Sequence, residues 1–408
     1  MRALRIGMAV VALLALGAAS RVQADVITDW NDKACAIVGK AGAGAPGHRL
    51  MAVVQVAVFE AVNSIDPKYT PYMEKIAAPR GASIDAAVAA ANRATLTELM
   101  PGEKAAIEAA YQSAMAAIPE GSAKADGVAV GEKAAAMVLA RAAKDGANGP
   151  DNYQPYTTPG KYVPTVIPAV PMWARRTPWI LEKPSQFRPG PPPALDSDTW
   201  ERDLREVRML GSKNSTERTA QQTDIARFWE ETRPLIYHPV VRSVALMPGR
   251  SVAQNARLYA AATMAADDAL ITIFDAKYAY NFWRPVTAIR NEHTAGKSRT
   301  SADLGWSPFI STPMHPEYPC AHCVVSGAVG AVLNAELGGR PAPKLSSSSP
   351  TANGMVREWT SVADFTDEVR LARIYDGVHY RNSTVVGNDM GVKVGVLVSQ
   401  KFARPASY

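Results

Sequence analysis

The stretch ARLYAAATMAADDALITIFDAKYAYNFWRPVTAIR, residues 256–290, decides the fold class. It is rich in alanine, which has the highest helix propensity, and it lacks the alternation of apolar and polar residues that a half-buried strand shows. We predict two helices here, over residues 251–270 and 271–290. They belong to a helical block that begins near residue 194.

The helical pattern continues on both sides of this stretch. Upstream, alanine-rich segments separated by proline or glycine predict helices at 48–65, 83–100, 103–118 and 121–144. Within and after the second block, further helices are predicted at 215–231, 319–337, 356–378 and 388–402, with a loop rich in serine and proline at 341–350. We therefore expect an all-α protein made of two helical bundles packed as one compact unit.

A proline-rich excursion separates the two bundles. Residues 150–193 contain twelve of the thirty prolines of the chain, and proline cannot continue a helix interior. The aromatic residues of this segment favour packing onto the body over free disorder. The predicted organisation is an N-terminal bundle at 25–149, a connecting segment at 150–193 and a C-terminal bundle at 194–408 that carries the site described below.

The first residues have the pattern of a secretory signal. Arg2 and Arg5 precede an apolar run over residues 6–19, and small residues follow before Asp25. The run is too short to cross a bilayer, which needs about 20 residues. We predict that residues 1–24 are a signal peptide and that the mature protein is periplasmic or secreted, with no integral membrane segment.

Charge and cysteine content exclude several functional classes. Removing residues 1–24 takes away three arginines and no acid, so the net charge falls from +6 to about +3. So small a charge predicts no nucleic-acid partner and no anionic membrane surface. Three cysteines, Cys35, Cys320 and Cys323, cannot form a disulfide scaffold, and their pairing stays open.

The first of three candidate motifs runs from Lys277 through Trp283 and Arg284 to Pro285. Lys277 and Arg284 are seven residues apart, which on a helix is about two turns and nearly the same face. The aromatic residues between them indicate an apolar environment, where a cation needs an anionic partner. Taken alone, the pair could equally belong to a solvated cationic edge.

The second motif is HPEYPCAHC, residues 315–323. Pro319 predicts a helix start whose first-turn N–H groups form an anion site, with His322 one turn in. Taken alone, His322 better fits a buried histidine that is hydrogen-bonded to a carbonyl. Cys320 and Cys323 lack the further pair of a zinc site and the following histidine of a haem site, so buried thiols are favoured over a redox dithiol.

The third motif joins Arg373 and His379. On a helix, residues six apart lie roughly two turns apart, so both side chains could reach one ligand. Gly377 between them would cost about 1 kcal/mol relative to alanine inside a helix. That cost indicates that a backbone or a ligand approaches closely at this position.

In this order, K-x6-R-P, P-x-x-H and R-x5-H resemble the vanadium-dependent haloperoxidases and the type-2 phosphatidic acid phosphatases. The flanking residues resemble the bacterial haloperoxidase-like branch in particular, over the segments 51–72, 256–290, 306–322 and 373–381. The resemblance covers most of the mature chain outside the proline-rich excursion. It implies one pocket that holds vanadate as cofactor or phosphate in its place.

The resemblance implies which residues would hold the anion. Lys277, Arg284 and Arg373 would contact its equatorial oxygens, because cationic forks suit oxyanion geometry. The Cys320 side chain and the Ala321 amide would add donors at the helix start. The family usually has Ser-Gly at these two positions, and a thiol is a weaker donor than a hydroxyl.

The resemblance also implies catalytic roles. His379 would be the vanadium ligand, or the nucleophile of a phosphatase, and His322 would be the acid/base. Lys277 would polarise hydrogen peroxide bound to the cofactor. His315, where bromoperoxidases of the family carry histidine, would line the halide pocket with Trp283 and favours bromide or iodide.

Three functions follow from this reading. The leading one is a vanadate-dependent haloperoxidase-like enzyme that oxidises halide with hydrogen peroxide. The second is a soluble exported acid phosphatase that acts on phosphate esters with His379 as nucleophile, although Ser383 stands where that branch usually has Asp. The third is a non-catalytic oxyanion-binding or redox-sensing protein in which Cys320 has compromised catalysis. The halide, the organic acceptor and the oligomeric state stay open.

Overall fold

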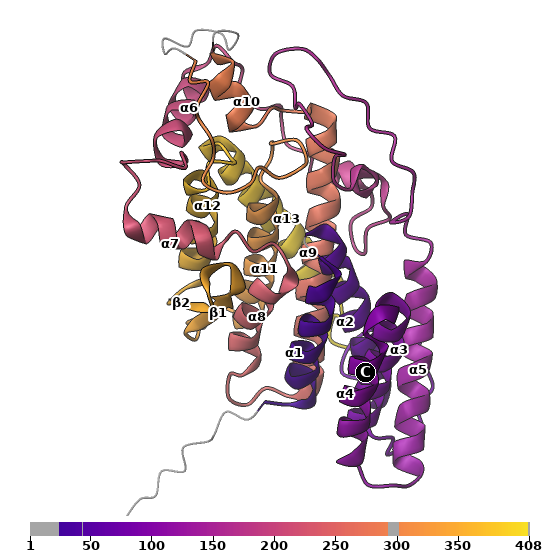
Figure 1. The fold of residues 1–408 in the computed structure, drawn as a ribbon. Coiled ribbons are helices and arrows are strands. Elements are labelled where there is room, and N and C mark those ends of the chain that lie inside the picture. The colour runs from indigo at the N-terminus through magenta and orange to yellow at the C-terminus, as the bar shows by residue number, and fades with distance from the viewer. Residues whose placement is uncertain (1–23, 43, 293–301, 407–408) are drawn as a thin grey trace, which may run out of the picture.

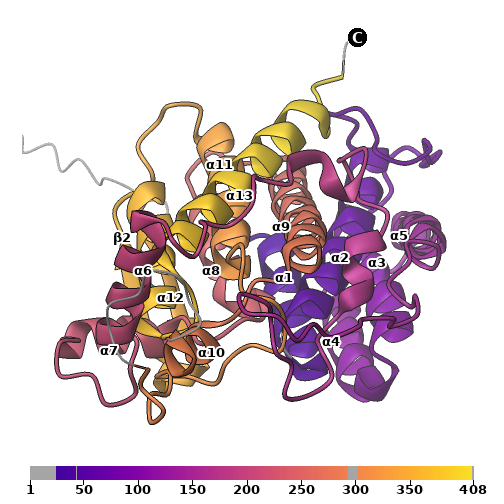
Figure 2. The same ribbon diagram turned by 90° about the horizontal axis from the view of Figure 1, so that it is seen from above.

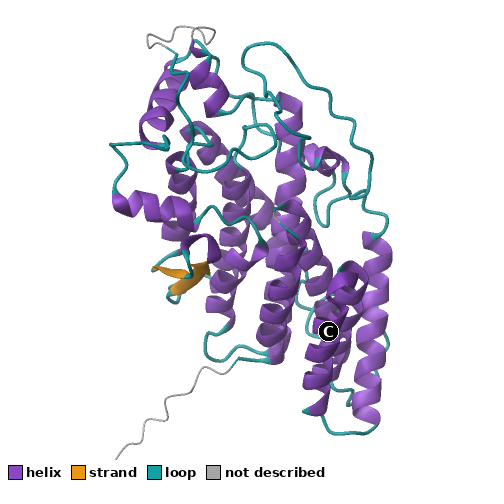
Figure 3. Cartoon of the chain, viewed as in Figure 1, coloured by secondary structure: helices purple, strands orange, loops and turns teal. Residues whose placement is uncertain are grey.

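The computed structural model describes residues 24–42, 44–292 and 302–406. The predicted signal peptide at 1–24 lies, apart from its last residue, outside the described residues. The described chain is helical, with one small two-stranded sheet (Figures 1 and 3). The all-α prediction is therefore confirmed, and no helix among the described residues is long and apolar enough to cross a membrane.

The N-terminal group contains α1 (Val26–Val38), α2 (Ala45–Ile65), α3 (Ile84–Leu99), α4 (Lys104–Ala116) and α5 (Ser122–Ala142). The first of these helices was not predicted. It begins at a capping box in which the Asp25 side chain accepts from the Thr28 N–H and the Thr28 side chain returns the contact. The other four lie within a few residues of their predicted bounds, because their proline and glycine breaks are strong local signals.

The proline-rich segment packs onto the body of the protein. α5 ends at Ala142 and the next α-helix begins at Asp198, so only 3-10 turns, Pro171–Arg175 and Pro184–Phe187, interrupt the described stretch between them. Trp173 and Trp179 are buried. The segment arches over one end of the long helix α9 (Figure 1).

The C-terminal group contains α6 (Asp198–Leu210), α7 (Ala220–Phe228), α8 (His238–Ala245), α9 (Val252–Tyr280), α10 (Pro285–Arg290), α11 (Ala321–Leu337), β1 (Leu345–Ser349), β2 (Met355–Trp359), α12 (Val362–Tyr375) and α13 (Arg381–Lys401). The two strands pair antiparallel, with Leu345 opposite Trp359. The predicted loop at 341–350 and the predicted helix start at 356 are therefore wrong. A run of serines alternates between buried and exposed here without the apolar alternation that announces a strand.

The helix α9 joins the two groups. It is one helix and not the two that were predicted, and nearly all of its residues from Ala253 to Lys277 are buried. It packs against α2 on one side and against α11 and α13 on the other (Figure 2). A helix that is covered on all sides needs an apolar surface all round, which explains the composition of residues 256–280.

The close packing of α11 on α13 sets the start of α11. A Cβ atom at Gly391 would lie 2.1 Å from the carbonyl oxygen of Val324, and one at Gly387 would lie 2.5 Å from that of Cys320. Glycine removes both conflicts, so the two backbones approach directly. The first turn of α11 thereby lies beside the first turn of α13, where two of the sequence motifs meet.

Candidate active site

The three motifs meet where several helices begin or end. Lys277 lies in the last turn of α9, Arg284 lies just before α10, and Arg373 lies in the last turn of α12. His322 is in the first turn of α11, and His379 precedes α13. All five side chains are buried.

Two of the cations are held by backbone carbonyls. The Lys277 ammonium donates to the carbonyl oxygens of Pro316 at 2.9 Å and Glu317 at 2.7 Å. The Arg284 guanidinium donates from Nε to the His315 carbonyl at 2.9 Å and from Nη1 to the Val378 carbonyl at 2.8 Å. Burial, with the charge of Arg284 nearby, holds the pKa of Lys277 well below its usual value. Burial lowers the pKa of Arg284 to about 10.

The predicted helical spacing of Lys277 and Arg284 is wrong, although the two residues do come together. α9 ends at Tyr280, and Asn281 turns the chain with a φ of 51°. Arg284 then occupies the position just before α10. The convergence comes from this turn and not from two residues on one helix face.

Arg284 also contacts two histidine rings. Its Nη1 is 3.3 Å from His379 Nε2 and its Nη2 is 3.1 Å from His315 Nδ1. A guanidinium only donates, so His379 Nε2 accepts, whereas His315 Nδ1 also lies 3.2 Å from the Pro316 carbonyl oxygen, which requires a donor. Burial and the charges of Lys277 and Arg284 hold the pKa of both histidines well below the usual range. Both rings are therefore neutral near pH 7.

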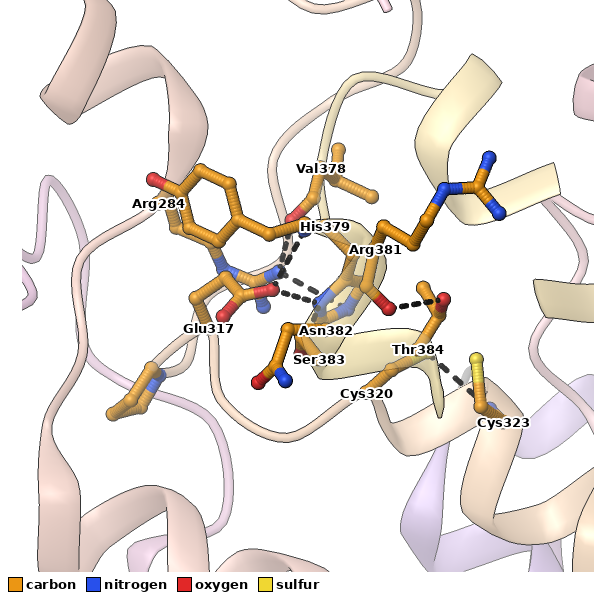
Figure 4. A network of polar contacts seen from close by, with 12 residues as sticks. Arg284, Glu317, Cys320, Cys323, Val378, His379, Arg381, Asn382, Ser383 and Thr384 are labelled. Atoms are coloured by element: carbon orange, nitrogen blue, oxygen red, sulfur yellow. Dashed lines mark hydrogen bonds and ion pairs between the residues drawn. The ribbon is translucent and has the colours of Figure 1, made fainter. Parts of the chain in front are cut away.

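A carboxylate completes the environment of His379 (Figure 4). Glu317 Oε1 is 2.7 Å from His379 Nδ1 and accepts the Tyr380 N–H at 3.1 Å. Burial raises the pKa of Glu317 to about 7, although the charges of Lys277 and Arg284 oppose the rise. Sequence analysis did not single out Glu317. Glu317 is the only acidic residue in the segment 306–322, and an acid among motif residues could have been recognised as a candidate partner of a histidine.

The predicted placement of Gly377 inside a helix is wrong. α12 ends at Tyr375, and Gly377 turns the chain with a φ of 79°. A Cβ atom there would lie 2.2 Å from the Gly211 carbonyl oxygen. The predicted close approach of a backbone is thus confirmed, and this turn directs His379 toward Arg284 and Glu317.

Arg373 is only partly compensated. Its Nη1 donates to the Trp229 carbonyl at 2.8 Å and lies 2.6 Å from an Asp376 carboxylate oxygen. The contact with Asp376 is an ion pair by distance. It lacks the geometry of a hydrogen bond, and both Asp376 oxygens are without a hydrogen-bond partner among the described residues. Burial raises the pKa of Asp376 to about 7. The buried Nε of Arg373 also has no partner in the described chain.

His322 contacts the segment that follows α7. Its Nε2 lies 3.0 Å from the Glu231 carbonyl oxygen. A carbonyl accepts only, so Nε2 carries a hydrogen and Nδ1 is the basic atom. Burial and the charge of Arg373 hold the pKa of His322 well below its usual value.

The helix α11 begins later than predicted. The helix was predicted to start at Pro319, but its first residue is Ala321 and its N-cap is Cys320. The Cys320 sulfur accepts the Cys323 N–H at 3.3 Å, as a serine hydroxyl would at this position. Burial raises the pKa of Cys320, but contact with Cys323 and the charge of Arg373 outweigh it and lower the pKa overall. All three cysteines are free and buried.

A cavity of about 80 Å³ lies at the centre of these residues. Its lining among the described residues is Gly44, Ala45, His48, Thr232, Tyr237, Leu270, Phe274, Pro313, His315, Ala321, His322, Val325, Arg373 and His379. The start of α2 therefore contributes to a site that was placed in the C-terminal bundle alone. His48 Nε2 donates to the Thr232 carbonyl at 3.2 Å, and burial lowers the pKa of His48 to about 4. Sequence analysis missed His48, because α2 is far from the motifs in sequence.

Four predicted site residues are not on the described cavity wall. Lys277 contacts the backbone of Glu317, and Arg284 contacts His315, which does line the cavity. Cys320 is the N-cap of α11 and precedes the cavity residue Ala321. Trp283 stacks on Trp200 with ring centroids 5.9 Å apart. The turn after α9 directs Arg284 toward the cavity, and its neighbour Trp283 lies in an aromatic cluster outside the described cavity lining.

The residues present fit a tetrahedral oxyanion. Three buried cations face two carboxylates, and two of the cations rest on neutral carbonyls. Arg373 Nε is an unpartnered donor, and the first-turn N–H groups of Ala321 and His322 cannot be satisfied inside α11. No group of three or more His, Cys, Asp or Glu side chains in the described residues could hold a metal cation. The buried cations and the unpartnered donors are what make this donor set suitable for an anion.

Comparisons with known proteins agree with this geometry. A family model described as the VCPO second helical-bundle domain matches residues 257–407. A crystal structure described as the first bacterial vanadium-dependent iodoperoxidase superposes with a TM-score of 0.80 at 25% identity, over 94% of this chain and 97% of that one. The chain is therefore similar to bacterial vanadium-dependent haloperoxidases in fold, and its C-terminal part matches a haloperoxidase domain model.

Two further comparisons give a similar result. The holo form of a bacterial vanadium-dependent chloroperoxidase has a TM-score of 0.72 at 17% identity, over 88% of this chain and 92% of that one, which is a likeness of fold. The vanadium chloroperoxidase of Curvularia inaequalis is 25% identical over 239 residues. That match spans 43% of this chain and 38% of the Curvularia protein, which is well under two thirds of its length.

Proposed function

We propose that this protein is a vanadate-dependent haloperoxidase that oxidises bromide or iodide with hydrogen peroxide, and that it is exported to the periplasm or secreted. The observation that carries the proposal is one cavity lined by His315, His322, Arg373 and His379, with Arg284 in contact with His379 and Lys277 in contact with the backbone of Glu317. The likeness to vanadium-dependent haloperoxidases supports vanadate as the resident group.

The three cations would offset the charge of the oxyanion. Arg373 would donate through its unpartnered Nε, and Lys277 and Arg284 would act from behind the loop at residues 315–317. Their carbonyl partners are neutral, so their charge is not cancelled at close range. When bound, vanadate supplies Lewis-acid activation of hydrogen peroxide without changing its oxidation state.

The histidines divide the remaining work. His379 presents Nε2 as the ligand atom, because its Nδ1 is engaged by Glu317. His322 keeps a hydrogen on Nε2 at the Glu231 carbonyl, so its Nδ1 would take up or return a proton at the cavity. His315 would contact the halide, supported by Phe274, whose ring packs edge-on at 5.2 Å.

One observation favours a second candidate, phosphate ester hydrolysis. The carboxylate of Glu317 on His379 Nδ1 leaves a lone pair on Nε2, as a histidine nucleophile requires. Phosphate and vanadate share the same tetrahedral shape, so one donor set serves both. In this reading His379 would carry the phosphoryl group and His322 would protonate the leaving group.

The deciding experiment is peroxide-dependent bromide and iodide oxidation by the purified protein, with and without orthovanadate. We expect activity only with orthovanadate, and a fall of at least about 100-fold in His379→Ala, because even outer partners of a metal ligand are worth 10- to 100-fold. His238→Gln is the matched control. His238 is a buried histidine that contacts Asn31 outside the cavity, and its variant should keep the activity.

Two results would contradict the haloperoxidase proposal. One is a folded protein that binds vanadate but oxidises no halide. The other is activity that persists in His379→Ala. Hydrolysis of p-nitrophenyl phosphate, with a phosphohistidine that is absent from His379→Ala, would establish the second candidate instead.

A further inference from the structure

Glu317 is a fully buried carboxylate whose closest side-chain contact is a histidine and not a cation. Its Oε1 lies 2.7 Å from His379 Nδ1, whereas Lys277 contacts only the backbone oxygen of Glu317. Burying a carboxylate is costly unless it is paired or hydrogen-bonded. The contact to His379 therefore calls for an explanation.

The backbone of Glu317 is held at both ends. Its N–H donates to the Phe282 carbonyl at 2.8 Å, and its carbonyl accepts from Lys277 at 2.7 Å. Both contacts come from the end of α9 and the turn that follows it. The backbone of Glu317 is thus fixed close to Lys277, which limits where its side chain can reach.

The hydrogen bonds at Oε1 fix the tautomer of His379. The Tyr380 N–H lies 3.1 Å from Oε1 and can only donate, so Oε1 is an acceptor. The 2.7 Å contact with His379 then needs its hydrogen on Nδ1. The other ring nitrogen, Nε2, keeps its lone pair and accepts from Arg284 at 3.3 Å.

One other side chain lies near His379 Nδ1 among the described residues. The Ser383 hydroxyl is 3.5 Å away, at the limit of a hydrogen bond. A hydroxyl both donates and accepts, so it does not fix a tautomer. Glu317 is the shorter and the more directive partner.

We propose that Glu317 is a positioning residue that holds His379 in the Nδ1–H tautomer and directs Nε2 toward the oxyanion. The inference rests on the proposed role of His379 as the ligand or nucleophile, and it holds for vanadate and phosphate alike. An outer carboxylate also raises the basicity of a ligating histidine. Glu317 therefore sets how tightly the anion is held.

The second oxygen of Glu317 makes a conservative test feasible. Oε2 has no hydrogen-bond partner in the described part of the chain, and Glu317 lines a second cavity, of about 10 Å³, with Asn382 and Ser383. A glutamine would keep its oxygen facing the Tyr380 N–H and place its NH2 group at the Oε2 position. Glu317→Gln should therefore fold and keep the His379 tautomer, whereas Glu317→Ala should lose it.

The test measures the anion and the histidine separately. Orthovanadate affinity is measured by calorimetry, with inorganic phosphate as a competing probe. The tautomer of His379 is read from nitrogen-15 NMR of histidine-labelled protein, in which six histidines give few signals to assign. We expect Glu317→Ala to bind orthovanadate about 10- to 100-fold more weakly and to lose the Nδ1–H signature, and Glu317→Gln to recover most of both.

Asp203→Asn is the matched control. Asp203 is a buried carboxylate at the same helix start, and it accepts the Asn382 N–H at 2.6 Å and a contact from Arg202. Its variant should keep the orthovanadate affinity and the His379 tautomer. An equal loss in Asp203→Asn would mean general loosening of α13 and would overturn the positioning role.

Failure of this inference is distinguishable from failure of the proposed function. A wild-type protein that binds no orthovanadate removes the proposed function, and the NMR signature still tests the tautomer. A wild type that binds orthovanadate, with Glu317→Ala binding it equally well, overturns the inference alone. An Nε2–H signature for His379 in the wild type would overturn it directly.

Discussion

Two buried charge clusters each include one residue of α9, Asp267 in the first and Lys277 in the second, and they differ in what surrounds the cations. In the first, Arg176 lies 2.7 Å from a carboxylate oxygen of Asp145 and 2.7 Å from one of Asp267. In the second, Lys277 and Arg284 meet backbone carbonyls and neutral histidine rings. The first cluster is neutralised inside the protein, and the second retains positive charge.

The neutralised cluster attaches the proline-rich segment to the body. Arg176 belongs to that segment, Asp145 follows α5, and Asp267 is in the middle of α9. The neighbouring Asp268 accepts the backbone N–H groups of Trp179 at 2.6 Å and of Ile180 at 2.8 Å. These contacts explain why a segment so rich in proline is ordered.

The difference teaches how to tell a structural cluster from a functional one. Both clusters are buried, and both combine arginine with acidic residues. What separates them is the nature of the closest acceptor, since a carboxylate cancels a charge and a carbonyl only solvates it. A buried cation held by carbonyls remains able to attract an external anion.

The largest expected effect is on the neutralised cluster. Arg176→Met leaves Asp145 and Asp267 without their shared cation and should lower the free energy of unfolding by about 3–5 kcal/mol. Urea denaturation measures it. Arg175→Met is the control: that arginine is exposed and should change the value by no more than about 0.5 kcal/mol. Equal changes in the free energy of unfolding in both variants would show that the buried ion pairs of Arg176 contribute no more to stability than an exposed arginine does.

The next effect separates binding from stability in the second cluster. Lys277→Met should weaken orthovanadate binding by about 10- to 100-fold, the worth of a charged hydrogen bond. The free energy of unfolding should stay within about 1 kcal/mol or rise, because the lowered pKa of Lys277 shows that the fold disfavours its charge. A loss of stability as large as that of Arg176→Met would break the comparison.

A smaller effect concerns His48, a cavity residue whose pKa the charge of Asp267 raises slightly against the larger effect of burial. Burial lowers its pKa from 6.5 to about 4, so between these values only the unfolded state takes up the proton. The stability contributed by His48 is present above pH 6.5 and is lost as pH falls toward 4. From pH 7.5 to pH 5 the loss is about 2 kcal/mol.

His48→Gln should reduce that pH dependence by the same amount. Glutamine can still donate to the Thr232 carbonyl but takes up no proton in this range. Unfolding free energies of the wild type and the variant, measured at pH 7.5 and pH 5, give the difference. Identical pH dependence in both proteins would show that His48 titrates normally in the fold.

The smallest effect belongs to a solvent-exposed ion pair between a lysine and a glutamate. Lys344 and Glu358 lie 3.1 Å apart across the hairpin, with side chains 67% and 51% exposed. Water screens such a pair, so Lys344→Ala should change the free energy of unfolding by less than about 1 kcal/mol. A larger change would mean that proximity alone, and not burial, decides the worth of these ion pairs.

Local signals in the sequence determined the helical content and most helix positions. Proline and glycine breaks bounded α3, α4 and α5 within a few residues. The spacing of charged residues drew attention to Lys277, Arg284, Arg373, His322 and His379, and the structure brings all five to one place. Each motif alone was ambiguous, and the resemblance of the three motifs to a known family grouped these residues.

Only the tertiary structure decided how those residues meet. The predicted helix faces for Lys277 with Arg284 and for Arg373 with His379 were wrong, because α9 and α12 end between the paired residues. Turns at Asn281 and Gly377 make the convergence instead. Their geometry depends on contacts with distant segments, such as the Gly211 backbone against Gly377.

The contacts that these residues make with distant partners were also not predicted. His48 reaches the cavity from α2, and Glu317 reaches His379 from another segment of the chain. Sequence spacing carries no information about contacts between residues that are dozens or hundreds of positions apart. Chain order therefore determined which candidate residues to consider, and packing decided which of them line the cavity and which lie beside it.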